Sequence, residues 1–196
     1  MSEKRRCVLE AGQIGFAVLR REDIPTMTAW FENFEYSSYL GMLGRLVTLE
    51  DETGWFERHA SQNDLNVTFG ILELETSRLI GTCSLMDINH QRQTATLGIG
   101  IGEIDCWNKG YGTQAVRLLA EYGMHFKNLY NIKLEYYDFN LRGARAYEKA
   151  GFRFAGRRRG ALQIGGERFD DITMDITRDE VDLSRMRAVM GLSEKT

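Results

Sequence analysis

Gly110 and Gly112 stand at the start of a stretch with helical periodicity, and their spacing is suited to binding phosphate. A glycine-rich turn that opens a helix presents unpaired backbone N–H groups and the positive end of the helix dipole. The segment just upstream, 95–102, alternates apolar residues with three glycines, which leaves one face of a strand without side chains. Together these features favour an extended, phosphate-bearing ligand that runs from the turn along the bare face of the strand.

The glycine turn has two other interpretations. Gly110-x-Gly112-x-x-Ala115 also fits the dinucleotide-binding fingerprint, with Glu135 as the acid that would bind the ribose. Such a unit normally opens its domain, whereas this turn lies past the midpoint of the chain, so a nucleotide-binding oxidoreductase is the weaker alternative. Ordinary turn chemistry would explain both glycines without any ligand.

A second group of residues follows the predicted strand 131–137 and begins a short predicted helix. Tyr147 lies seven residues after Asn140, which places the two about two helical turns apart on one face. Gly151 is a typical helix-ending residue. Asn140 could act only as an N-cap and Tyr147 could be a core residue, so both also have a purely structural explanation.

In their order and separation, these two stretches resemble the two cofactor motifs of the GNAT family of acetyl-CoA-dependent N-acyltransferases. The glycine turn is similar to the pyrophosphate loop of that family, and 140–152 is similar to its second motif. The resemblance covers 14–176 and is strongest to the ribosomal-protein N-terminal and spermidine acetyltransferase branches. Trp107 departs from the pattern, because the family usually has Gln or Arg there, so no side-chain contact to phosphate carries over at this position.

The resemblance implies acetyl-CoA as co-substrate and direct transfer of its acetyl group to a primary amine in a ternary complex. It implies that the glycine strand holds the pantetheine arm through its backbone and that the glycine turn holds the pyrophosphate. The implied cofactor-binding residues are Ile99, Gly100, Ile101, Lys109, Gly110, Tyr111, Gly112, Thr113, Asn140, Ala144 and Tyr147. A catalytically silent CoA-binding module is the alternative from another functional class.

Acyl transfer from a thioester needs a neutral amine, a donor to the carbonyl oxygen and a proton for the leaving thiolate. The resemblance makes Tyr147 the general acid and the N–H of Ile101 the donor. Glu103 follows the glycine strand directly and is the first choice for the general base. Glu73, Asp87 and water are its rivals, and a solvated carboxylate at a strand end explains Glu103 equally well.

Residues 30–48 are expected to form much of the acceptor wall, with substrate contacts from Trp30, Phe34, Glu35 and Tyr39. Glu32 and Glu35 could attract a polyamine or a cationic N-terminus, although exposed carboxylates at a helix end are the commoner explanation. A protein N-terminus and a small amine or polyamine therefore remain competing acceptors.

The elements that must position these groups form one predicted domain, 13–178, with a flexible lead-in at 1–12 and a C-terminal surface helix or tail at 179–196. Alternating patterns predict strands at 14–19, 65–74, 79–88, 95–102, 131–137, 151–156 and 171–176. Asp23 is the expected N-cap of the first helix. A helix between two consecutive strands makes 95–102 and 131–137 parallel neighbours. The predicted fold is α/β (α+β): a GNAT-like mixed, mostly antiparallel sheet of six to seven strands, flanked by helices on both faces.

Composition narrows the class further. A chain of 196 residues that is 43% hydrophobic can bury one good-sized core. A net charge of −3 argues against a general nucleic-acid binder. Three cysteines at unrelated spacings and three scattered histidines predict neither disulfides nor a metal site. With no apolar run of membrane-spanning length, we expect a cytoplasmic protein with no membrane or nucleic-acid partner, and a homodimer stays open.

Overall fold

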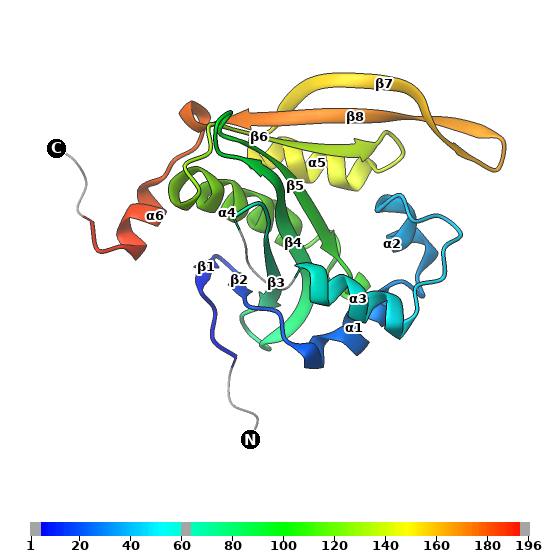
Figure 1. Ribbon diagram of the computed structural model, residues 1–196, viewed down its shortest axis with the longest axis horizontal. Coiled ribbons are helices and arrows are strands. Elements are labelled where there is room, and N and C mark those ends of the chain that lie inside the picture. Colours follow the sequence, from blue (N-terminus) through cyan, green and yellow to red (C-terminus); the bar gives the residue numbers. More distant parts are fainter. Residues whose placement is uncertain (1–4, 60–63, 193–196) are drawn as a thin grey trace.

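The structure, a computed structural model, describes residues 5–59 and 64–192. Its centre is an eight-stranded sheet in the order β1-β2-β3-β4-β5-β6-β8-β7 (Figure 1). β5 and β6 pair in parallel, as predicted, and the other neighbours pair antiparallel. The strands are β1 (Leu9–Ala11), β2 (Ile14–Ala17), β3 (Val67–Glu73), β4 (Arg78–Asn89), β5 (Thr94–Ile101), β6 (Asn131–Tyr137), β7 (Arg153–Ile164) and β8 (Glu167–Thr177).

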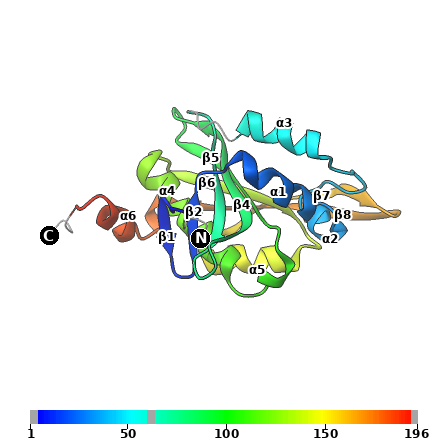
Figure 2. The same ribbon diagram turned by 90° about the horizontal axis from the view of Figure 1, so that it is seen from below.

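Helices cover both faces of the sheet, as the sequence predicted (Figure 2). One face packs against α4 (Tyr111–Phe126) and α5 (Leu141–Ala150), and the other packs against α1 (Ile24–Trp30), α2 (Phe34–Tyr39) and α3 (Leu49–His59). The remaining short elements are η1 (Arg21–Asp23), η2 (Ile104–Cys106), η3 (Arg178–Glu180) and α6 (Ser184–Val189). Among the described residues, none of these helices combines the length and apolarity that crossing a bilayer requires.

β5 and β6 separate after a short paired segment, and this opening positions the functional site. β5 pairs with β4 as far as Ile101, but with β6 only from Thr94 to Thr96. The N–H of Gly102 donates to the carbonyl of Ile80 on the β4 side. Because backbone groups alternate in direction along a strand, those of Ile99 and Ile101 face the opening.

Aromatic side chains lie over the glycine face of β5 at Gly100 and Gly102, so this part of the face is not bare, contrary to prediction. A Cβ atom at Gly100 would lie 2.6 Å from the hydroxyl oxygen of Tyr36. A Cβ at Gly102 would overlap the indole ring of Trp30. The glycines therefore admit side chains from α1 and α2 against the sheet, a tertiary contact that the alternating pattern alone does not reveal.

The predicted lead-in at 1–12 contains ordered structure in its described part. Leu9–Ala11 forms β1, which pairs with β2 and raises the strand count above the predicted six to seven. Arg5 forms a two-pronged ion pair with Asp23, with N–O distances of 2.7 and 2.8 Å, and both side chains are largely buried. Asp23 stands at the N-cap position of α1, as predicted, but its side chain accepts from the backbone N–H of Arg20 and makes no hydrogen bond to α1.

The C-terminal segment also packs more closely than a surface tail. Met186 in α6 is fully buried in the main core. Arg185 lies 3.4 Å from the carboxylate of Glu121 on α4. Because α6 is only six residues long, its apolar pattern is too short to predict this packing.

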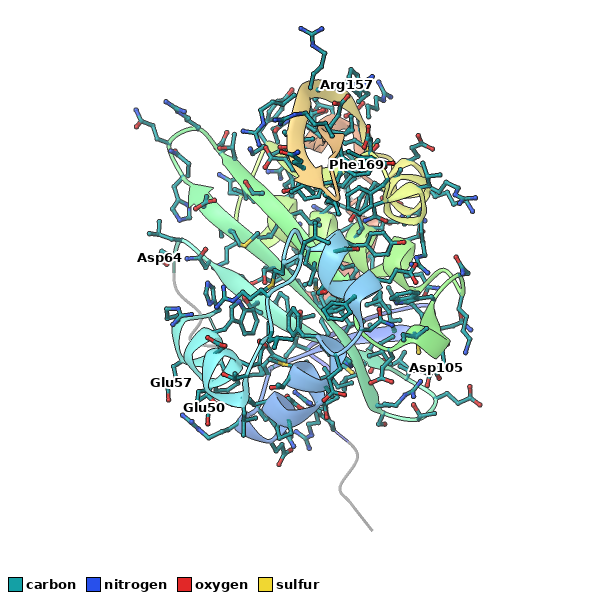
Figure 3. All side chains as sticks on the ribbon, turned by 90° about the vertical axis from the view of Figure 1, so that its right-hand side faces the viewer. Glu50, Glu57, Asp64, Asp105, Arg157 and Phe169 are labelled. Carbon is teal, nitrogen blue, oxygen red and sulfur yellow. The ribbon has the colours of Figure 1, made fainter. Side chains whose placement is uncertain are left out.

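β7 and β8 extend beyond their predicted ranges as a long hairpin that carries Arg157 and Phe169 (Figure 3). Arg157 pairs with Asp170, and Arg158 lies 3.3 Å from Asp171. Cross-strand ion pairs of this kind stabilise a hairpin, which explains why the arginine run continues a strand. The run at 157–159 lines neither of the two cavities described below.

Candidate active site

A cavity of about 380 Å³ lies where β5 and β6 separate. It is bounded by the end of β5, the glycine turn and facing residues of α2, α4 and α5. The expected cofactor residues that line it are Ile99, Gly100, Ile101, Gly110, Tyr111, Gly112, Thr113, Asn140 and Tyr147. We call this cavity the donor cavity, and Lys109 and Ala144, also expected there, do not line it.

The glycine turn forms the N-terminus of α4, as the phosphate-binding interpretation requires. Gly110 has a φ of +85°, a left-handed conformation that favours glycine. Tyr111 then anchors the first turn, because its hydroxyl donates to Glu73 at 2.8 Å. A bond from Thr76 and this bond from Tyr111 lower the pKa of Glu73. Glu73 thus holds the turn in place and lines neither cavity.

Basic side chains along α5 add positive charge to the donor cavity. Arg142, Arg145 and Lys149 lie at helical spacing along α5 and line the cavity beside the α4 N-terminus. Cationic side chains and free helix N–H groups are the groups that bind phosphates. The residues present therefore fit the diphosphate-bearing part of CoA. The basic face of α5 was missed from sequence, although its spacing of three and four residues was the available signal.

Trp107, which departs from the family pattern, makes structural contacts that the sequence did not predict. Its indole N–H donates to the carbonyl of Ile101 at 2.7 Å. The guanidinium of Arg142 lies 3.6 Å from the centre of the Trp107 ring, and it also pairs with Glu35 at 2.9 Å. These contacts connect α2, the loop after β5 and the start of α5 across the mouth of the donor cavity.

Tyr147 is a nearly buried residue on the donor cavity, with 9% of its surface exposed. Burial, and then the neighbouring Tyr136, raise the pKa of Tyr147 to about 12, so its hydroxyl keeps its proton at neutral pH. Asn140 is the N-cap of α5, where its side-chain oxygen accepts from the N–H of Gly143 at 2.8 Å. This bond fixes the first turn of the helix that presents Tyr147.

The position of Glu103 does not favour its predicted role as a base. One carboxylate oxygen accepts from the Trp30 indole at 2.9 Å, and the other lies 3.4 Å from Arg78. Glu103 lines neither cavity, and neither does Asp87, which is exposed beside the irregularity in β4. Glu103 is therefore best explained as an anchor for Trp30.

A second cavity, of about 250 Å³, adjoins the donor cavity and is called here the acceptor cavity. The two share four lining residues: Tyr36, Leu40, Ile99 and Gly100. Much of its wall comes from 30–48, as expected, with Trp55 of α3 opposite. Of the predicted substrate residues, Trp30 lines it and Tyr39 lines the donor cavity, whereas Phe34 and Glu35 line neither.

Glu52 is a buried carboxyl group on the acceptor cavity, with 7% of its surface exposed. Burial, and then the charge of Asp51, raise the pKa of Glu52 to about 7. Across the described part of the chain, its carboxyl group makes no hydrogen bond or ion pair. Sequence reasoning missed Glu52, although it lies one helical turn before Trp55 and so shares its face.

The cysteines nearest the two cavities are poor nucleophiles. Burial raises the pKa of Cys83 well above its ordinary value, and burial is also the main cause that raises the pKa of Cys106. A thiol that keeps its proton reacts slowly. Within 5–59 and 64–192, no cluster of His, Cys, Asp or Glu has the composition of a metal site.

A splayed sheet beside a glycine turn, with a cationic helix face opposite, is an arrangement suited to an extended phosphate-bearing molecule. The family model described as "Acetyltransferase (GNAT) domain" matches residues 14–153, more than half of the chain. The chain belongs to the GNAT acetyltransferase family.

Two relatives from Bacillus are similar over part of their length. "Probable N-acetyltransferase YjcK" of Bacillus subtilis (strain 168) is 37% identical over 106 residues, which are 54% of this chain and 58% of that protein. "Uncharacterized N-acetyltransferase p20" of Bacillus licheniformis is 27% identical over 123 residues, 60% of this chain and 68% of that protein. The chain thus matches less than two thirds of the first of these relatives.

Solved structures share the fold. Spermidine N-acetyltransferase from Vibrio cholerae, in complex with CoA and spermine, has a TM-score of 0.76 at 22% identity, over 86% of this chain and 97% of that one. A GNAT-family acetyltransferase from Bacillus anthracis has a TM-score of 0.76 at 19% identity, over 88% of this chain and 99% of that one. At these identities, the comparison establishes the architecture.

Proposed function

We propose that this protein transfers an acetyl group from acetyl-CoA to a primary amine by direct attack in a ternary complex. The observation that carries the proposal is the junction of two cavities at Ile99 and Gly100. One cavity suits an extended diphosphate, and the other has aromatic walls and a buried carboxyl group. Donor and acceptor bound in these cavities would meet at the end of β5.

On the donor side, the N-terminus of α4 and the basic face of α5 would hold the diphosphate of acetyl-CoA. The backbone groups of Ile99 face the opening, where they would hydrogen-bond to the pantetheine arm. The N–H of Ile101 would polarise the thioester carbonyl, which stabilises the oxygen charge that develops during attack.

On the acceptor side, we assign to Glu52 the role that the sequence analysis gave to Glu103. A carboxyl group with a pKa of about 7 is matched to removing a proton near neutral pH. Glu52 lines the acceptor cavity beside Tyr36, a residue shared with the donor cavity. It would take the proton from the bound ammonium, either directly or through one water, and leave a neutral amine.

Tyr147 would complete the reaction as the general acid. The new C–N bond forms as the C–S bond breaks; the attacking nitrogen gives up one proton to solvent, and the departing thiolate needs a proton. Tyr147 lines the donor cavity and its hydroxyl is protonated at neutral pH, so it would supply that proton. Direct transfer also agrees with the high pKa values of Cys83 and Cys106, which disfavour an acyl-cysteine.

The test is CoA release by the full chain with acetyl-CoA or succinyl-CoA and a broad panel of primary amines. Mass spectrometry of the amine would identify the product. We expect stoichiometric formation of an N-acetyl amide and CoA. Tight CoA binding without transfer to any amine would instead indicate a silent CoA-binding module. Thermal protection by NAD and not by CoA would indicate the oxidoreductase alternative.

A further inference from the structure

We infer that the acceptor cavity selects an amine that also carries a carboxylate, with the amine toward Glu52 and the carboxylate toward Arg58. The inference rests on the proposed function, because it names the class of amine that the same site would accept.

The inner part of the cavity suits the amine. Only 7% of the surface of Glu52 is exposed, and its carboxyl group makes no hydrogen bond or ion pair with any described residue. Trp30, Tyr36 and Trp55 line the same cavity. Aromatic faces attract an ammonium group, and a carboxylate removed from water attracts it more strongly.

The outer part of the cavity suits a carboxylate. Arg45 and Arg58 both line it and both are exposed. Arg45 already lies 3.4 Å from Asp51, whereas the ion pairs found among the described residues leave Arg58 without an acidic partner. Gly54 makes room for the Arg58 side chain, since a Cβ at that position would lie 3.2 Å from its guanidinium. A guanidinium can bind a carboxylate with two parallel hydrogen bonds.

A polyamine fits this charge arrangement less well. Its second ammonium group would reach the mouth of the cavity, where it would meet Arg45 and Arg58. Glu35, which was expected to attract such a substrate, lines neither cavity and is held by Arg142 at 2.9 Å and by Tyr39 at 2.8 Å. The cavity lining contains two arginines, Asp51 and Glu52, a balance that suits a zwitterion.

The test compares matched amines that differ only in the acidic group. Three pairs are used: an α-amino acid and its amide, a dipeptide and its C-terminal amide, and an ω-amino acid and its amide. Spermidine is added as a polycation. We expect kcat/KM to favour the carboxylate member by about tenfold in at least one pair and to be lower for spermidine.

Arg58→Gln should bring the carboxylate-to-amide ratio close to one, and Arg58→Lys should retain part of the preference. Arg92→Gln is the control, because Arg92 is an exposed residue in the turn after β4 and lines neither cavity. Equal rates for both members of every pair, faster turnover of spermidine, or a ratio unchanged by Arg58→Gln would overturn the inference while leaving acetyl transfer intact. Absence of transfer to every amine would instead overturn the proposed function, and the inference with it.

Discussion

Tyr147 has its pKa raised to about 12 by burial, which keeps a proton available for a leaving thiolate. Replacing Tyr147 with Phe removes the hydroxyl and keeps the ring that packs against Tyr136, 5.6 Å away between ring centres. We expect kcat to fall by about 100-fold or more, the usual contribution of a general acid, with little change in CoA affinity. Steady-state thiol release and calorimetric CoA binding measure the two quantities.

Tyr130→Phe is the matched control for this variant. The Tyr130 hydroxyl bonds to Asp179 at 3.0 Å on the surface, and Tyr130 lines neither cavity, so kcat should be unchanged. A Tyr147→Phe protein with wild-type kcat would show that another group protonates the thiolate.

Glu52 should determine the acidic limb of the pH–rate profile. Its pKa of about 7 predicts that kcat/KM rises with pH around that value, as the carboxyl group loses its proton. The charged and titratable groups that line the cavity with it are Tyr36, Arg45, Asp51, Arg58 and Cys83. Burial raises the pKa of Tyr36, so Tyr36 stays protonated in this range.

Glu52→Gln should lower kcat/KM by about 100-fold and abolish the limb near pH 7. A limb that persists in this variant would exclude Glu52 as the base.

The same group should affect stability, with a defined sign. The folded-state pKa of Glu52 lies above the ordinary 4.5, so between pH 4.5 and about 7 the folded state binds more protons than the unfolded state. The free energy of unfolding should therefore fall as pH rises through this window, by about 1–3 kcal/mol. Urea unfolding at a series of pH values measures it, and Glu52→Gln should flatten the curve.

At the scale of elements, β5 joins both halves of the site because its glycines admit α1 and α2 on one side. Gly102→Ala would place a methyl group into the Trp30 ring and disturb the bond from Trp30 to Glu103. Overpacking of this kind costs about 1–3 kcal/mol of unfolding free energy. Gly156→Ala in β7 is the control, since no atom lies within 4 Å of the added Cβ. Equal stability of the two variants in urea would contradict the aromatic packing described here.

Local patterns predicted most elements of this sheet, because alternation and capping act over a few residues. Asn140, for example, is the N-cap of α5, a role that its place before the predicted helix allowed. The parallel pairing of β5 and β6 followed from the helix between them. Glu52 and the aromatic cover of β5 were missed because they depend on which distant elements pack together. The predicted role of Glu103 as the base rested on its place at the end of a strand. Its hydrogen bond with Trp30 could not be foreseen, because Trp30 lies 73 residues away in the sequence.

At the scale of the whole molecule, Arg5 ties the N-terminal segment to the start of α1 through Asp23. It also donates to the carbonyl of Val18. Arg5→Ala would leave the Asp23 carboxylate, with 8% of its side chain exposed, without its partner. Removing one member of a buried pair costs about 3–5 kcal/mol, which corresponds to a Tm about 10 °C lower for a chain of this size.

Arg20→Ala is the control for this variant, because the pair of Arg20 and Glu22 is exposed and contributes little. Calorimetry of both variants and of the wild type measures the three Tm values. A Tm for Arg5→Ala within about 2 °C of the wild type would mean that the N-terminal ion pair does not stabilise the fold.

Direct transfer requires the two adjoining cavities to hold donor and acceptor at the same time. The direct test is a matrix of initial rates, with acetyl-CoA varied at several fixed concentrations of the best amine. Simultaneous occupancy predicts reciprocal plots that intersect, and no acetylated protein when the amine is omitted. Parallel plots together with an acetylated cysteine, detected by mass spectrometry in the absence of amine, would contradict direct transfer.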